Sequence, residues 1–178
     1  MIAEEIIDRY YEGQDELKRL LLLHSRQVAD KAVEVLDRHP EIIADREFVY
    51  EAAMLHDIGI VYTDAPGIHC HGTHPYICHG MLGAELLRRE GLPRHARVAE
   101  RHTGTGLTAA TIKAQGLPLP QADFSPETIE EQIVCYADKF YSKSHPERTK
   151  TEEQVRQMLS RFPDASLERW DKWVSLFS

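Results

Sequence analysis

Histidine and aspartate residues recur in this 178-residue sequence at positions where a helical pattern would place apolar residues. His24, for example, continues the helical stripe that includes Leu21 and Val28. Buried imidazoles and carboxylates are costly unless they are paired or bind a metal ion. The pattern therefore predicts one shared polar centre between helices, suited to divalent metals. The inward-facing positions that share this property are His24, His56, His79, His102 and Asp138.

Asp57 directly follows His56, close to the predicted end of a helix. A single histidine on an apolar face is more often an ordinary core residue than a ligand. Five such positions on five predicted helices argue against independent coincidence. A carboxylate has two oxygens and can join two cations, so Asp57 is the natural candidate for a bridging ligand.

The elements that would position these side chains are helices. Helical periodicity and Gly or Pro punctuation predict them over about 15–39, 46–57, 79–90, 93–102 and 108–115. Ser125, Pro126 and Glu127 predict the start of a helix that runs to about residue 144. Thr151 and Gln154 fit a capping box that opens the C-terminal helices. Residues 61–78 show no periodicity and are interpreted as a loop over the site, and strand-type alternation is weak throughout.

Five segments of the sequence resemble the HD-domain superfamily, and more narrowly its small bacterial and archaeal HDIG-type members. The resemblance covers about residues 20–142 and implies an all-α helical bundle with a metal centre between helices. We expect one domain over 1–178, with the C-terminal helices at 151–177 packed on it. The segments are HSRQVADKA (24–32), MLHDIG (54–59), HGMLGAELL (79–87), ERHTGTGLT (100–108) and IVCYADKF (133–140).

The resemblance also implies a ligand set and an activity. One metal ion would take His24, His56, Asp57 and Asp138, and a second would take His79 and His102 with a bridging Asp57. The expected activity is that of a phosphohydrolase acting through a metal-activated water on a phosphomonoester, a nucleotide or a related phosphodiester. Iron or manganese is favoured, and mixed His and carboxylate ligation also agrees with Zn, Co or Ni.

Members with an HDIGK motif carry a lysine after the glycine, where this sequence has Ile60. The phosphate contact of that lysine would have to come from Arg101, Lys139 or Lys143. Arg101 is predicted as a catalytic residue that stabilises negative charge, and Lys139 as a substrate-binding residue. The histidine-rich segment adds His69, His71 and His74 as candidate substrate-binding side chains.

Two other functions fit the same residues. Some HD-domain oxygenases hold a mixed-valent di-iron centre with the same ligand order, and iron-dependent oxygen uptake would distinguish them. A non-catalytic sensor of a nucleotide or metal is the second alternative, and it would bind its ligand without turnover.

The composition of the chain excludes some classes of binding partner. A formal net charge of −8 argues against binding to duplex nucleic acid or to an anionic membrane, whereas a small phosphorylated substrate remains compatible. The N-terminal segment lacks the layout of a secretory signal, and no apolar run reaches the length of a membrane span, so we expect a cytoplasmic protein.

The three cysteines are expected to be free thiols. The apolar face around Trp170 and Trp173 is expected to pack on the core or to form a homodimer surface.

Overall fold

The computed structural model describes residues 2–162 and 164–178. Most of these residues are helical, and the strands are only two or three residues long, which confirms the predicted all-α class. The described part contains α1 (Ile2–Tyr10), α2 (Asp15–Arg38), α3 (Arg46–Leu55), α4 (His79–Arg89), α5 (Pro93–Arg101), α6 (Ala109–Gln115), α7 (Ile129–Asp138), α8 (Glu152–Leu159) and α9 (Asp164–Phe177).

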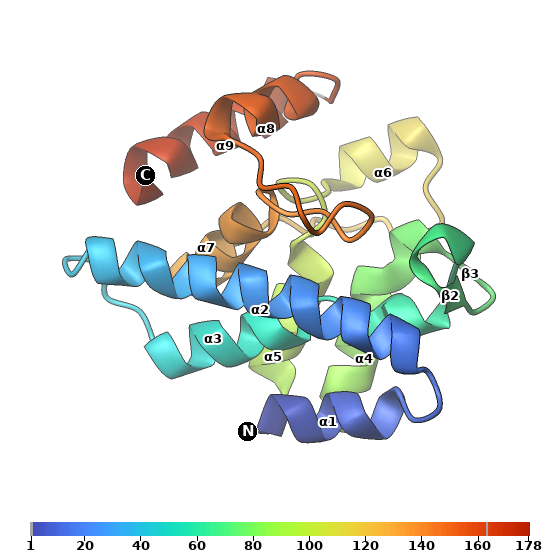
Figure 1. Ribbon diagram of the computed structural model, residues 1–178. Helices are drawn as coiled ribbons and strands as arrows, with labels where there is room; N and C mark the ends of the chain where they lie inside the picture. The colour runs from blue at the N-terminus through green and yellow to red at the C-terminus, as the bar shows by residue number, and fades with distance from the viewer. Residues whose placement is uncertain (1, 163) are drawn as a thin grey trace.

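The longest helix, α2, crosses the middle of the molecule and packs against α3 and α7 (Figure 1). Leu21, Val28 and Val35 recur every seven residues on α2 and are buried, as expected for one face of a helix. Helices α4 and α5 pack on each other, and α1 lies against α3. Within the described residues, no helix is long and apolar enough to cross a membrane.

The segment 61–78 is more regular than the predicted loop. Within it lie β1 (Thr63–Ala65), β2 (Cys70–His71) and β3 (His74–Pro75), which form a small sheet in the order β2-β1-β3. β1 pairs with β2 antiparallel and with β3 parallel. Three short 3₁₀ helices accompany these strands: η1 (Ile58–Tyr62) precedes β1, η2 (Pro66–Ile68) lies between β1 and β2, and η3 (Tyr76–Cys78) follows β3. The strands escape prediction because two or three residues are too few to show alternation.

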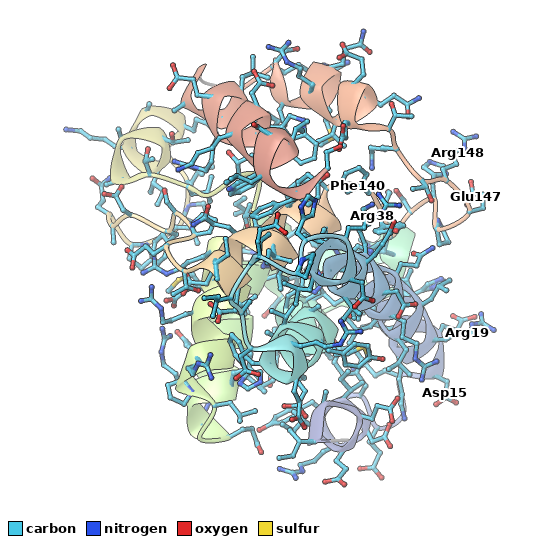
Figure 2. The ribbon with its side chains drawn as sticks, turned by 90° about the vertical axis from the view of Figure 1, so that its left-hand side faces the viewer. Asp15, Arg19, Arg38, Phe140, Glu147 and Arg148 are labelled. Carbon is cyan, nitrogen blue, oxygen red and sulfur yellow. The ribbon has the colours of Figure 1, made fainter. Side chains whose placement is uncertain are left out.

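Helix α7 begins later and ends earlier than predicted. Its N-cap is Thr128, whose hydroxyl accepts from Glu131 N while the Glu131 carboxylate accepts from Thr128 N. Ser125 does not cap the helix, and its carbonyl accepts a hydrogen bond from Arg101. The helix ends at Asp138, and residues 139–150 form a loop that closes where Lys150 N donates to Phe140 O. Glu147 and Arg148 mark the exposed tip of this loop (Figure 2).

The capping box of α7 makes a measurable prediction. Thr128→Ala should lower the free energy of unfolding by about 1 kcal/mol, because the backbone N–H of Glu131 in the first turn of the helix loses its hydrogen-bond acceptor. Urea unfolding followed by circular dichroism would measure the change. Thr128→Ser keeps the hydroxyl and should stay close to wild type; equal destabilisation by both substitutions would contradict the capping role.

Helix α9 packs against α7, and α8 packs against α9. Helix α8 opens on the predicted capping box of Thr151 and Gln154. Trp170, Trp173 and Phe177 of α9 are buried. The Trp170 ring stacks on Tyr136 at 5.1 Å between centroids, and Trp173 Nε1 donates to Gln132 Oε1 at 3.0 Å. Trp170, Trp173 and Phe177, the centre of the predicted apolar face, are therefore covered by other parts of this chain.

Candidate metal centre

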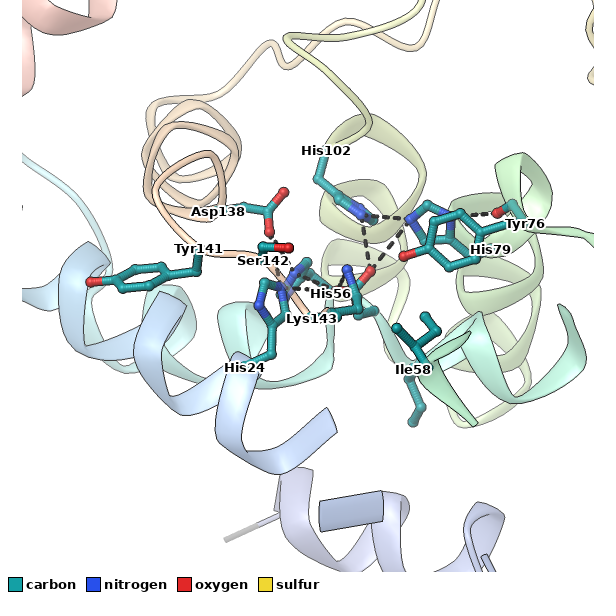
Figure 3. Close-up of polar contacts among 12 residues, drawn as sticks. His24, His56, Ile58, Tyr76, His79, His102, Asp138, Tyr141, Ser142 and Lys143 are labelled. Atoms are coloured by element: carbon teal, nitrogen blue, oxygen red, sulfur yellow. Dashed lines mark hydrogen bonds and ion pairs between the residues drawn. The ribbon is translucent and has the colours of Figure 1, made fainter. Parts of the chain in front are cut away.

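The structure brings all six predicted ligands together between helices (Figure 3). His24 lies in the middle of α2, and Asp138 is the last residue of α7. Helix α3 ends at Leu55, two residues before the predicted end, so His56 and Asp57 follow it directly. His79 begins α4, and His102 follows the last residue of α5. Their role as ligands stays a prediction, which the geometry below supports.

The first group consists of His24, His56, Asp57 and Asp138. Asp57 Oδ2 lies 3.1 Å from Nε2 of His24 and 3.1 Å from Nε2 of His56. Asp138 Oδ1 lies 3.0 Å and 3.4 Å from the same two nitrogens. Two imidazole nitrogens and two carboxylate oxygens therefore face one another around a common point.

The second group consists of Asp57, His79 and His102. Nε2 of His79 lies 3.0 Å from Nε2 of His102. These nitrogens lie 3.4 Å and 3.2 Å from Asp57 Oδ1, respectively. Asp57 thus presents Oδ2 to the first group and Oδ1 to the second, as a bridging carboxylate would.

The spacing within both groups suits a divalent metal ion. Bonds of about 2.1 Å place neighbouring ligand atoms about 3.0 Å apart in an octahedron and about 3.4 Å apart in a tetrahedron. The distances above span the same range. His56 Nε2 and both carboxylate oxygens of Asp57 are also buried without a well-formed hydrogen bond in the described structure. Buried polar atoms in that state are costly, and coordination to a metal would satisfy them.

Three of the histidines are oriented by backbone carbonyls. In each ring Nδ1 lies 2.6 Å from the carbonyl oxygen three residues earlier, and since a carbonyl can only accept, Nδ1 carries the proton. In all three rings Nε2 faces the centre. Burial alone would lower the pKa of His56, but Asp57 and Asp138 raise it to about 9. Burial lowers the pKa of His79 to about 3 and also lowers the pKa of His102, which keeps both imidazoles neutral. The donor–acceptor pairs are His56–Ala53, His79–Tyr76 and His102–Ala99.

Both aspartates are held ionised by neighbouring positive charge. Burial alone would raise the pKa of Asp57, but His56 and Lys143 hold it well below its usual range. Burial would likewise raise the pKa of Asp138, which Lys139 and neighbouring histidines hold well below its usual range. Ionised carboxylates are the form in which these side chains bind metals.

Lys139 lies in this centre, whereas Arg101 does not join it. Lys139 is buried, and its Nζ donates to Asp138 Oδ2 at 2.5 Å and to His102 O at 3.0 Å. Arg101 Nη1 donates to Ser125 O at 2.7 Å and pairs with Glu127 at 3.4 Å. These contacts link the end of α5 to the segment that precedes α7, and they lend no support to the predicted catalytic role of Arg101.

The three histidines of segment 61–78 also lie outside the cluster. His69, His71 and His74 are exposed, and His69 Nδ1 lies 3.3 Å from a Glu16 carboxylate oxygen. None of the three lines the cavity beside the metal centre described below. Their predicted substrate contacts therefore have no support in the structure.

Two further side chains lie at the centre, Lys143, for which the sequence gives a weak signal, and Tyr76, for which it gives none. Lys143 Nζ lies 2.5 Å from Asp57 Oδ2 and is largely buried (Figure 3). The Tyr76 ring stacks on His79 at 4.6 Å between centroids. The sequence presents Lys143 only as one of three basic candidates and offers no signal for Tyr76. Lys143 lies on a loop and Tyr76 on a single 3₁₀ turn, both too irregular or too short to show periodicity.

A cavity of about 640 Å³ lies against Asp138 and the lysines of the centre. Its walls come from β1 and η2, from the loop 139–150 and from the end of α8. The lining side chains used below are Ile68, Tyr76, Asp138, Lys139, Lys143, Lys150, Met158 and Phe162.

Comparison with known proteins identifies relatives over most of the chain. The model of a family described as HD domain matches residues 21–142. The tRNA (cytidine(56)-2'-O)-methyltransferase of Picrophilus torridus is 39% identical over 124 residues, which are 69% of this chain and 32% of that protein. The protein of the same name from Thermoplasma volcanium is 36% identical over 123 residues, 68% of this chain and 32% of that protein. The chain thus spans about a third of the length of these relatives.

One further sequence relative and the crystal structures of one HD domain also resemble this chain. An uncharacterized protein of Methanocaldococcus jannaschii is 43% identical over 95 residues, 53% of this chain and 48% of that protein. Crystal structures of the HD domain of the L. monocytogenes phosphodiesterase PgpH, one of them in complex with cyclic-di-AMP, superpose with TM-scores of 0.51 and 0.52 at 18% identity. They cover 85% of this chain and 88% and 87% of theirs. At that identity the likeness concerns the fold.

Proposed function

The chain belongs to the HD-domain family, and on that premise we propose that it is a metal-dependent phosphohydrolase. The observation that carries the proposal is Asp57, whose two carboxylate oxygens face two separate groups of buried ligands. This arrangement suits two divalent ions held by one bridging carboxylate. Iron and manganese are the ions we favour, and Zn, Co and Ni remain compatible with the donor set.

The geometry suggests a separate role for each group of residues in the proposed reaction. Bound divalent ions would lower the pKa of a water and offset the negative charge of a phosphoryl group. Asp57 would fix the spacing of the two sites, and the carbonyl partners of the histidine Nδ1 atoms would hold the rings in place. The three cysteines are buried, and burial raises their pKa, that of Cys135 to about 12. Thiolate nucleophiles are therefore disfavoured.

The proposed substrate is a small phosphorylated molecule: a phosphomonoester, a nucleotide or a related phosphodiester. Nucleotide esters come first in the proposed substrate panel, because a phosphodiesterase HD domain of similar fold was crystallised with cyclic-di-AMP. The methyltransferase relatives match this chain over about a third of their length, and we do not extend their named activity to it.

The test combines elemental analysis of the purified protein with a panel of phosphate esters in the presence of Mn, Fe, Co, Ni or Mg. We expect about two transition-metal ions per chain and phosphate release that His56→Ala abolishes. His95→Ala is the matched control, because His95 is also buried but contacts Phe48 and Glu51 rather than the cluster. A protein that binds no metal under any loading condition would refute the proposal, and two irons with oxygen uptake but no phosphate release would favour an oxygenase.

A further inference from the structure

The cavity beside the metal centre differs in character from one wall to the next. Its inner end carries Asp138, Lys139 and Lys143, whereas Ile68, Tyr76, Met158 and Phe162 line its sides. Such a cavity presents positive charge at one end and a largely apolar surface along the rest. Lys150, Ser142 and Ser144 also line it, and the two serine hydroxyls are hydrogen-bonded to each other at 3.0 Å. A ligand that matches it has an anionic head and an apolar body.

The two lysines at the inner end are not equivalent. Lys139 Nζ is already held by Asp138 Oδ2 and by the carbonyl oxygen of His102. Among the described residues, the one ion pair found for Lys143 Nζ is with Asp57 Oδ2. An ammonium has three hydrogen-bond donors. Lys143 therefore has donors available for a ligand, whereas two of the three donors of Lys139 are already engaged.

The partner of Lys143 is itself a predicted metal ligand. Asp57 Oδ2 is the oxygen that faces Nε2 of His24 and of His56. An ion bound in that group would compete with the ammonium for this oxygen and repel its charge. Lys143, on a loop rather than a helix, could then turn its Nζ toward an anion in the cavity without moving Asp57.

The loop that carries Lys143 is fastened at both ends and in its middle. Lys150 N donates to Phe140 O at 2.8 Å, and Gln27 Nε2 of α2 donates to Pro146 O at 3.0 Å. These bonds keep Lys143 over the centre although it lies five residues beyond the end of α7. The lysine is therefore positioned by the fold.

The apolar walls narrow the class of substrate. Ile68 and Tyr76 come from the segment next to the small sheet, whereas Met158 and Phe162 come from α8 and the residues after it. These side chains contribute hydrophobic and aromatic contacts and, apart from the Tyr76 hydroxyl, no hydrogen-bonding group. A flat or aromatic body fits such walls better than a polyhydroxylated one, whose hydroxyls would lose their hydrogen bonds to water.

We propose that Lys143 binds the phosphate of the substrate and that the apolar walls hold its organic part, so that the substrates are phosphate esters of aromatic or otherwise apolar alcohols. This inference rests on the proposed phosphohydrolase function.

The experiment measures binding by calorimetry with two non-hydrolysable probes, phenylphosphonate and methylphosphonate, on the metal-loaded protein. Wild type should bind phenylphosphonate about tenfold or more tightly than methylphosphonate. Lys143→Gln should weaken both probes by about tenfold or more, since each loses a charge-assisted hydrogen bond. Met158→Ala should weaken only phenylphosphonate, and Lys143→Arg should restore part of the affinity.

Three results would overturn the inference: equal affinity of wild type for the two probes, unchanged binding by Lys143→Gln, or loss of metal from Lys143→Gln, which would make Lys143 part of the metal site. Metal content and circular dichroism of each variant are recorded alongside. Because binding needs no turnover, the predicted pattern in a protein that hydrolyses no ester would support the binding roles of Lys143 and the apolar walls while refuting the proposed function.

Discussion

Asp57→Asn is expected to remove both metal ions and to lower the rate of phosphate release by more than about a thousandfold. Asp57 is the residue common to both ligand groups. Its Oδ2 lies 3.1 Å from Nε2 of His56, and its Oδ1 lies 3.2 Å from Nε2 of His102. An amide has one oxygen, carries no charge and presents hydrogen-bond donors at its nitrogen, so it cannot bridge two cations.

Two matched variants separate bridging from ordinary ligation. Asp138 belongs only to the first group and His79 only to the second. Elemental analysis should therefore find close to no metal in Asp57→Asn and about one ion per chain in Asp138→Asn and in His79→Ala. Retention of two ions by Asp57→Asn would contradict the bridging role, provided that circular dichroism shows a folded variant.

The clustering of these six side chains could be predicted from the sequence because each lies on, or directly at the end of, a helix with strong apolar periodicity. His24 between Leu21 and Val28 is the clearest case, since those residues are buried as their spacing requires. The helix boundaries agree with the predicted ones to within one or two residues at α2, α3, α4 and α5, because glycine and proline mark most of their ends.

Lys143 shows where sequence reasoning stops. A helix continued to residue 144 would have carried Lys143 about 7.5 Å further along its axis than Asp138. The chain instead leaves the helix at Asp138 and returns over the centre. That path depends on contacts with distant residues, such as the bond from Gln27 to Pro146, which no local pattern records. The two-residue strands and the stacking of Tyr76 on His79 arise in the same way.

Gly59→Ala is expected to lower the free energy of unfolding by more than about 3 kcal/mol, the upper range for overpacking a core. A Cβ atom at this position would lie 2.1 Å from the carbonyl oxygen of His79 and 2.4 Å from the backbone nitrogen of Gly83. Both atoms belong to the backbone of α4, so no side-chain rotation can relieve the overlap. Helix α4 would have to move away from η1, and His79 would move with it.

The displacement of α4 would also disturb the candidate metal centre, because His79 begins α4 and its Nε2 belongs to the second ligand group.

Urea unfolding would measure the stability of Gly59→Ala, and elemental analysis should show loss of the second ion in the fraction of the variant that folds. Gly67→Ala is the matched control: a Cβ there meets no atom within 4 Å, so stability should change by no more than about 0.5 kcal/mol. A Gly59→Ala variant with wild-type stability and both ions would show that the close approach of η1 to α4 is not what holds His79 in place. The glycine of the HDIG segment is therefore expected to act through backbone packing, next to a histidine and an aspartate that act through their ligand atoms.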